Sequence, residues 1–305
     1  MRSPKLPKDP YSMTVVTATF YPQWHDGEPK QPLTADKLRG DLALQTLRAA
    51  KNQGTQIALV DGGSSEEFRK ALSKSGITFE LQKEDGSQGA ARRQALEIAQ
   101  GLQGLKVICE TEPEKVSLVS DCLNIAAKPI LNSEADIVVP KRSQESFSTL
   151  PPYQAKSEQR SNKMYNQILR AHGLLKEEDP DIDFWFGVRL FANKPEIVEL
   201  FERKYQFDPT ETKLHQAVER NIDVYSNPLF FPIIEALKKG FKVRSVEVPY
   251  VHPSAQTEFE NDKPEFNRKR DIQRRAIITE LLHFIRRLEE SPKSRISQEK
   301  GNESR

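Results

Sequence analysis

Short apolar runs alternate with longer amphipathic stretches along the first half of the chain. The apolar runs are rich in β-branched residues and predict buried strands; they lie at 14–20, 56–60, 78–81, 106–110 and 135–140. Apolar residues at helical spacing predict helices at 36–52, 66–73 and 114–127, and an Ala-rich helix entered through the polar loop of 85–96. Strands that alternate with helices through short connections predict an α/β fold with a doubly wound, mainly parallel sheet.

The pattern changes after Pro140. A polar segment with two adjacent prolines predicts a loop at 141–153, and an alternating run predicts a last strand at 241–251. Further helices are predicted at 157–174, 195–204, 227–239 and 263–290. The expected parts of the chain are a flexible arm at 1–12, a domain over 13–255 with halves at 13–140 and 141–255, a C-terminal helix at 256–290 and a disordered tail at 291–305.

Composition limits the functions that this chain can have. Its 305 residues carry a formal net charge of +2, which is too small to predict nucleic-acid binding by itself. Two cysteines predict no disulfide framework and suit a reducing compartment. The first residues lack the apolar core of a signal peptide, and no run approaches the roughly 20 apolar residues of a membrane span. We therefore expect a soluble, cytoplasmic protein without a transmembrane segment.

The second predicted strand ends on Asp61, and two glycines and two serines then lead into a helix. In open α/β sheets, ligands bind just beyond the carboxyl ends of the strands, so Asp61 is a candidate ligand-binding carboxylate. Alternatively, Asp61 only shapes the turn, because Asp-Gly is a common turn pair.

A second candidate is the pair Glu110 and Glu112, which is separated by one residue at the end of the fourth strand. Side chains two residues apart point the same way in an extended strand, so the two carboxylates can hold Mg²⁺ or Mn²⁺. Alternatively, the pair only caps the helix that opens at Pro113.

Two further positions suit anion or metal binding. Gly89 and Arg92 lie where a polar loop enters a helix, and a helix N-terminus with an arginine can hold phosphate oxygens. Two arginines on the surface of a helix are the alternative. His252 directly follows the last apolar strand, where a histidine can be a metal ligand or a general acid.

The segment from Asp179 to Arg189 places acids before an aromatic cluster. Asp181 or Asp183 can act as a general base on a hydroxyl group, and Trp185 with its aromatic neighbours can stack on a sugar ring. Alternatively, these aromatic residues belong to the core. The basic helix at 263–290 can contact phosphate or a membrane surface, although interspersed acids favour a solvated face.

The order of these motifs resembles the nucleotide-sugar glycosyltransferases of the GT-A fold, and in general the family 2-like glycosyltransferases, over roughly 13–255. Val60–Ser65 looks like their acid-bearing turn at the nucleoside, and Gly89–Arg92 is similar to their phosphate-side helix start. Glu110 to Glu112 stands where the family has its Asp-x-Asp metal motif, with glutamate in place of aspartate. Asp183–Arg189 resembles the acceptor segment, and His252 falls where several members place a metal-binding histidine.

The resemblance implies a hexosyltransferase that moves a sugar from a nucleoside diphosphate sugar to an unknown hydroxyl acceptor, assisted by Mn²⁺ or Mg²⁺. Residues 13–140 would bind the nucleotide and 141–255 the acceptor. The implied roles are catalysis for Asp181 and Asp183, donor binding for Ala18, Phe20, Asp61, Gly89, Arg92 and Thr111, acceptor binding for Trp185 and Arg189, and metal binding for Glu110, Glu112 and His252. Two alternatives stay open: a non-catalytic nucleotide-sugar-binding or interaction protein, and a nucleotidyltransferase, although the loop after the first strand lacks the Gly, Arg and Lys typical of the latter.

Overall fold

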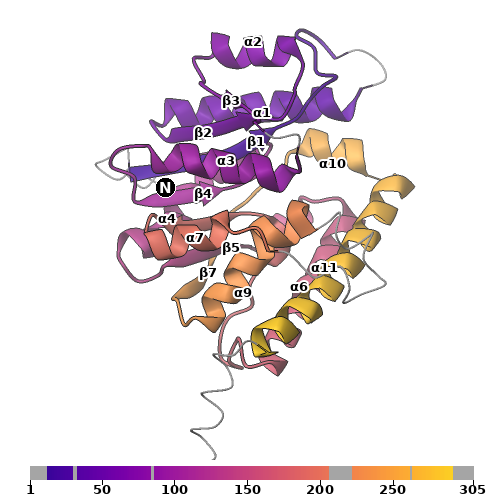
Figure 1. Ribbon diagram of the computed structural model, residues 1–305. Coiled ribbons are helices and arrows are strands. Elements are labelled where there is room, and N and C mark those ends of the chain that lie inside the picture. The colour runs from indigo at the N-terminus through magenta and orange to yellow at the C-terminus, as the bar shows by residue number, and fades with distance from the viewer. Residues whose placement is uncertain (1–11, 30–32, 84–85, 206–221, 262, 291–305) are drawn as a thin grey trace, which may run out of the picture.

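The structure is a computed structural model that describes residues 12–29, 33–83, 86–205, 222–261 and 263–290. Seven strands form one sheet in the order β3-β2-β1-β4-β6-β5-β7 (Figure 1). They are β1 (Met13–Thr19), β2 (Gln56–Asp61), β3 (Glu80–Leu81), β4 (Val107–Glu110), β5 (Ile137–Arg142), β6 (Arg189–Ala192) and β7 (Val243–Val248). Strand β6 runs antiparallel to β4 and β5, while the other paired strands are parallel. The predicted α/β fold with a mainly parallel sheet is confirmed.

The helical elements of the described residues follow the predicted alternation. They are α1 (Ala35–Asn52), α2 (Glu66–Lys74), α3 (Gln88–Gln100), η2 (Leu118–Cys122), α4 (Leu123–Leu131), α5 (Gln144–Ser148), α6 (Pro152–Ala171), η3 (Phe184–Phe186), α7 (Pro195–Glu202), η5 (Ile222–Phe230), α9 (Phe231–Lys238), α10 (Ser254–Glu260) and α11 (Pro264–Glu290). None of them is long and apolar enough to cross a membrane. The predicted tail and nearly all of the predicted arm lie outside the described residues.

The predicted loop at 141–153 is partly helical, which corrects the interpretation of its two prolines. The hydroxyl of Ser143 caps α5 by accepting a hydrogen bond from the backbone N–H of Ser146. Pro152 is the first residue of α6, where a missing N–H costs nothing because that group has no partner inside the helix. The proline pair therefore marks the beginning of a helix.

Helices cover both faces of the sheet and bury two main apolar layers. On one face, α3, α7 and α9 pack against the strands (Figure 1). On the other face, η2 and α4 pack against β1, β4 and β6. Successive residues of β1 divide between the layers, with Val16 in the first and Val15 in the second, as the alternation of side chains along a strand requires.

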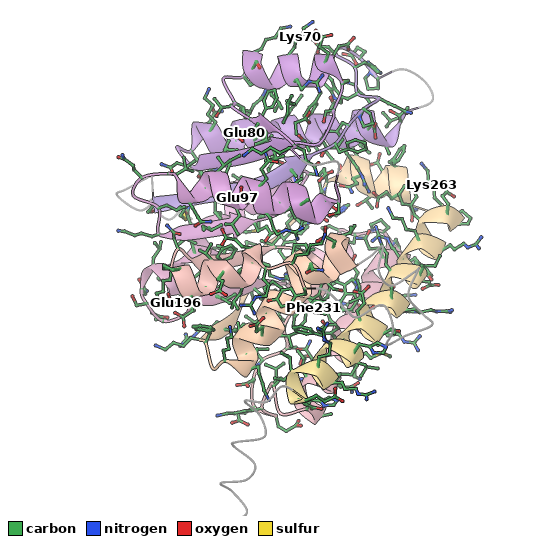
Figure 2. The ribbon with its side chains drawn as sticks, in the orientation of Figure 1. Lys70, Glu80, Glu97, Glu196, Phe231 and Lys263 are labelled. Atoms are coloured by element: carbon green, nitrogen blue, oxygen red, sulfur yellow. The ribbon has the colours of Figure 1, made fainter. Side chains whose placement is uncertain are left out.

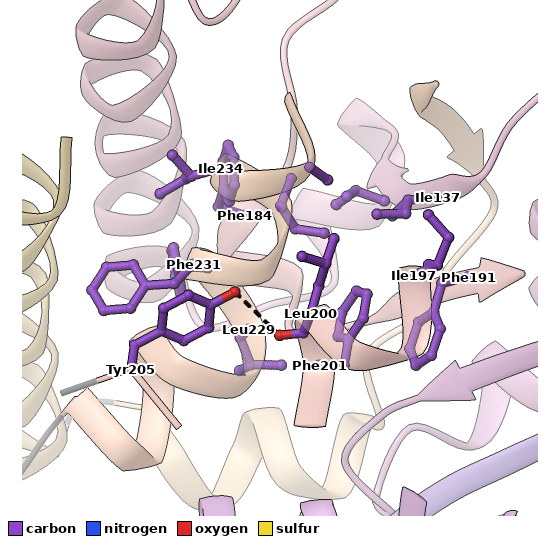
Figure 3. Packing of buried hydrophobic residues seen from close by; sticks show 14 of the residues in the cluster. Ile137, Phe184, Phe191, Ile197, Leu200, Phe201, Tyr205, Leu229, Phe231 and Ile234 are labelled. Carbon is purple, nitrogen blue, oxygen red and sulfur yellow. Dashed lines mark hydrogen bonds between the residues drawn. The ribbon is translucent and has the colours of Figure 1, made fainter. Parts of the chain in front are cut away.

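One face of the C-terminal helix α11 belongs to the core, although the acids interspersed among its basic residues favoured a solvated face. Leu281, Phe284 and Ile285 are buried in the first apolar layer, and the Phe284 ring stacks on that of Phe231 at 4.1 Å. Figure 3 shows Phe231 beside Tyr205, whose hydroxyl donates to the carbonyl of Leu200 at 3.2 Å. Figure 2 labels exposed charged side chains outside this interior, among them Lys70 on α2, Glu97 on α3 and Glu196 on α7.

A buried carboxyl group in α11 makes stability depend on pH. Glu280 is 0% exposed, its only hydrogen-bond partner among the described side chains is Ser226, and burial raises its pKa to about 8. The folded state therefore keeps the proton that the unfolded chain releases above its ordinary pKa near 4.5. The stability that this retained proton contributes is fully present below pH 4.5 and is lost as pH rises through 8.

We expect Glu280→Gln to become progressively more stable than the unmodified protein as pH rises from about 5 to 8. The difference in the free energy of unfolding should grow by about 1.4 kcal/mol per pH unit. Urea denaturation at three pH values measures it, and Glu265→Gln, at an exposed position of the same helix, is the matched control. A pH-independent difference would show that Glu280 is ionised in the folded protein.

Candidate functional site

A cavity of about 560 Å³ opens at the carboxyl edge of β1, β2 and β4, where ligands bind in open α/β sheets. The strand order places the loops after β2 and β1 towards one end of this edge, with the beginning of α3, and the loop after β4 in the middle of the edge. Residues of α6, η3, η5, α10 and α11 complete the lining and form its helical wall. The cavity therefore joins segments from both predicted halves of the chain and from the C-terminal helix.

Ala18 and Phe20, two of the predicted nucleoside contacts, line the first end of the cavity. The side chain of Phe20 is 64% exposed, which is unusual for a phenylalanine beside a cavity and offers a free ring face. Gly62 also lines this end, and a Cβ atom there would lie 2.9 Å from the side-chain oxygen of Gln82. The open aromatic ring suits a flat, stacked ligand group.

Asp61 is buried beneath this end and does not line the cavity. One carboxylate oxygen accepts a hydrogen bond from the Thr19 hydroxyl at 2.9 Å, and the other accepts one from the backbone N–H of Ser64 at 3.1 Å. Arg69 lies 3.6 Å from the second oxygen. These contacts support the alternative that Asp61 shapes the turn between β2 and α2.

Glu112 lies in the middle of the cavity, in the loop after β4. Its carboxylate forms an ion pair with the ammonium group of Lys115. Burial opposes its charge, but Lys115 and Arg92 lower the pKa of Glu112 to about 2. The carboxylate is therefore ionised at neutral pH.

His252 lines the same cavity, and its hydrogen bonds define its tautomer. Its Nδ1 atom lies 2.9 Å from the hydroxyl oxygen of Thr257, and that hydroxyl donates its proton to the carbonyl of Thr149 at 2.7 Å. Nδ1 must therefore donate, which leaves the lone pair on Nε2. Burial and the charge of Lys115 lower the pKa of His252 to about 4, so the ring is neutral at pH 7.

The donor atoms of Glu112 and His252 suit a divalent cation that also binds a ligand. Within the part of the chain that the structure describes, no group of three His, Cys, Asp or Glu side chains could hold a metal ion alone. However, Mg²⁺ is usually held by one or two carboxylates together with phosphate oxygens. A neutral histidine that donates its other N–H to a fixed oxygen is also typical of metal ligands.

Glu110, the first acid of the same motif, does not share the cavity. It is buried and its carboxylate lies 3.3 Å from Arg92 Nη1, so the predicted metal ligand and the predicted phosphate-binding arginine instead pair with each other. Thr111 is also buried and contributes its carbonyl as the acceptor for Thr17 at 2.8 Å. The Arg92–Glu110 ion pair and the Thr17–Thr111 hydrogen bond therefore fix the end of β4 and the beginning of its loop.

Gly89 lies close to the backbone of η5, whereas the sequence predicted that it lies close to a ligand. A Cβ atom at Gly89 would lie 2.0 Å from the carbonyl oxygen of Asp223 in η5. The carboxylate of Asp223 binds Arg93 at 2.7 Å, which attaches η5 to α3. The absent side chain of Gly89 therefore makes room for η5, which covers this part of the helix.

Neither predicted catalytic acid lines the cavity. Asp181 is 51% exposed at its side chain and forms an ion pair with Arg170 at 2.7 Å. Asp183 is buried, and its carboxylate accepts hydrogen bonds from Arg142 at 2.8 and 2.9 Å and from Asn162 at 2.6 Å. Both oxygens of Asp183 are thus engaged with the scaffold and do not face an acceptor.

Trp185 lines the cavity, as predicted for an acceptor contact, but Arg189 does not. Trp185 packs edge-on against Phe230 at 5.3 Å, so the aromatic cluster contributes to both the core and the cavity wall. The guanidinium group of Arg189 is fully buried and donates to the carbonyls of Phe184, Val188 and Leu229. It ties β6 to η5.

Several charged cavity residues were not predicted from the sequence. They are Asp36, Arg39, Glu114, Lys115, Arg142, Glu158, Lys269 and Arg270. Lys115 lies only three residues after Glu112, so the rule that ligands bind beyond strand ends could have found it. Lys269 and Arg270 belong to the basic run that was recognised, but only the packing of α11 beside α6 places that run at the cavity.

The fold and the cavity at the sheet edge define the class of structure as the GT-A type found in nucleotide-sugar glycosyltransferases. No protein-family model and no curated protein matches the sequence. Among solved structures, the chain is similar to glucosyl-3-phosphoglycerate synthase from Mycobacterium tuberculosis in complex with Mn²⁺, UDP and glucosyl-3-phosphoglycerate, with a TM-score of 0.53 and 12% identity over 90% of this chain and 80% of that one. The structure of the same enzyme with UDP gives identical values. Its structure with Mg²⁺ and UDP gives a TM-score of 0.50 and 12% identity over 90% of this chain and 79% of that one. This likeness shows the fold that the motif order predicted.

Proposed function

We propose that this protein is a glycosyltransferase that moves a sugar from a nucleoside diphosphate sugar to a hydroxyl acceptor. The observation that carries the proposal is one cavity at the carboxyl edge of the sheet that combines the exposed ring of Phe20, the ionised carboxylate of Glu112 and the neutral imidazole of His252. The enzyme with the similar fold binds UDP with Mn²⁺ or Mg²⁺, which supports this choice of ligand.

The cavity residues suggest how the donor would lie. The nucleoside would occupy the end formed by Ala18 to Tyr21, with its base on the Phe20 ring. The diphosphate would then lie beside Glu112 and His252. A divalent cation held by these two side chains would neutralise the negative charge that develops on the diphosphate as the sugar leaves.

The helical wall would receive the acceptor, with Trp185 beside the sugar. Arg39 and Arg270 both bind the carboxylate of Glu260, at 2.7 and 3.0 Å, while no carboxylate lies within ion-pair distance of Lys269 in the described part of the chain. Arg270 also lies 3.4 Å from Glu158, so Lys269 is the cation of these three that leaves positive charge at the cavity. An acceptor that carries a phosphate or carboxylate group suits this wall, and the solved enzyme was also crystallised with phosphoglyceric acid.

Calorimetry with UDP and GDP, and then with their sugars, tests the proposal in the presence of Mn²⁺, Mg²⁺ or a chelator. We expect one nucleotide diphosphate to bind, and we expect its sugar to be consumed when hydroxyl acceptors are supplied. Absence of nucleotide binding under every condition would overturn the proposal. Binding without turnover across an acceptor panel would favour a non-catalytic nucleotide-sugar-binding protein, consistent with the positions of Asp181 and Asp183 outside the cavity.

Replacing Phe20 with alanine is expected to weaken nucleotide binding roughly tenfold or more, because stacking of one base on an aromatic ring contributes about 1–3 kcal/mol. The melting temperature should not change, since most of the ring is exposed. Leu81→Ala is the control, because Leu81 is similarly exposed on β3 but does not line the cavity. Equal affinities for the two variants would place the nucleoside elsewhere.

A further inference from the structure

Lys115 places a fixed positive charge in the middle of the cavity. Its ammonium group forms an ion pair with Glu112 and lies 5.6 Å from the centre of the Phe186 ring. The side chain is only 13% exposed, although ion pairs three residues apart are usually solvated. The carboxylate and the aromatic ring therefore hold the ammonium group inside the cavity.

The charge of Lys115 acts on both side chains that would hold a divalent cation. It helps to lower the pKa of Glu112, and it also helps to lower the pKa of His252. Lys115 is thus within electrostatic reach of both residues. The ammonium group supplies positive charge beside Glu112, one of the two side chains proposed to hold a metal ion.

This ammonium group has capacity for a second anion. Among the described residues, Glu112 is the only carboxylate within ion-pair distance of Lys115. An ammonium group has three N–H donors, and one carboxylate oxygen occupies one of them. A diphosphate beside Glu112 would otherwise meet a repelling carboxylate, and Lys115 would offset that repulsion.

We propose that Lys115 is a built-in cation that binds the diphosphate of the donor, so that nucleotide diphosphate binding persists without a divalent metal ion. This inference rests on the proposed function and assigns a specific binding role within the same site. Lys115 donates hydrogen bonds to diphosphate oxygens, and a metal ion strengthens binding without being required for it.

Calorimetric titration of UDP into the full-length unmodified protein and into Lys115→Met, with chelator and with Mn²⁺, tests this role. If GDP is the nucleotide that binds, it replaces UDP in the titration. The unmodified protein should bind in chelator within about tenfold of its affinity in Mn²⁺. Lys115→Met should lose at least about thirtyfold in chelator and should recover much of this loss in Mn²⁺. The effect should be much smaller for the monophosphate, which lacks the second phosphate group.

Two further variants separate charge from folding. Lys115→Arg keeps the positive charge and should retain binding in chelator, while Lys128→Met removes an exposed lysine on α4 and should bind like the unmodified protein. Nucleotide binding only in the presence of metal, or equal binding by Lys115→Met and the unmodified protein in chelator, would overturn the role of Lys115 and leave the proposed function standing. Failure of every nucleotide diphosphate to bind, with or without metal, would overturn both.

Discussion

Replacing Glu112 with glutamine is expected to lower sugar transfer at least about a hundredfold while the protein stays folded. Glutamine has nearly the same shape, but it removes the negative charge that lines the cavity and pairs with Lys115. Losing one group that organises charge around a transition state typically costs a factor of 10²–10³. Release of nucleoside diphosphate from the donor sugar measures the change.

Glu110→Gln is the informative control, because the two glutamates belong to the same three-residue motif. Glu110 is buried against Arg92 and does not reach the cavity, so its replacement leaves a buried guanidinium group without its charged partner. We expect this variant to melt at a lower temperature but to transfer sugar normally where it is folded. Equal loss of transfer in both variants, with unchanged melting, would show that both carboxylates contact the ligand.

The fold was predictable because its strands are short apolar runs and its connections are short. The end of each predicted strand also located the cavity, since β1 and β4 lead directly to Phe20 and Glu112. His252 was found by the same reasoning, as it follows β7 closely. The positions of these residues at the cavity were predictable because each depends only on residues that are near one another in the chain.

Other predicted site residues have structural partners far away in the sequence. Gly89 approaches Asp223, and Arg189 binds the carbonyl of Leu229, forty residues later. A glycine or an arginine has the same local signature whether it faces a ligand or another segment of the protein. Only the three-dimensional packing shows which group each of these residues meets.

The position of the basic residues of α11 at the cavity also could not be predicted from the local sequence. The basic residues of α11 are evident in the sequence, but their interspersed acids favoured a solvated helix. The apolar positions of α11 pack it into the first core layer, and this packing brings Lys269 and Arg270 to the cavity. A charge pattern on one helix therefore did not reveal its function until the position of that helix was known.

Asp183→Asn is expected to destabilise the protein by about 3 kcal/mol, because it removes one of the two carboxylates that compensate the buried charge of Arg142. Burial disfavours the charged form of Asp183, but Arg142 lowers its pKa and keeps it ionised. The variant leaves Arg142 with Glu158, at 2.6 Å, as its remaining acidic partner. For a chain of 305 residues, the melting temperature should fall by roughly 5 °C.

Asp181→Asn is the matched control, since Asp181 lies two residues away and its carboxylate is half-exposed. Its replacement should change the free energy of unfolding by no more than about 0.5 kcal/mol, as is usual for exposed positions. Thermal melts and transfer assays on both variants decide between a structural and a catalytic role for the pair. Loss of transfer in Asp183→Asn with an unchanged melting temperature would support the catalytic role predicted from the sequence. A lowered melting temperature, with transfer intact in the folded fraction, would identify Asp183 as the residue that holds Arg142 at the cavity wall.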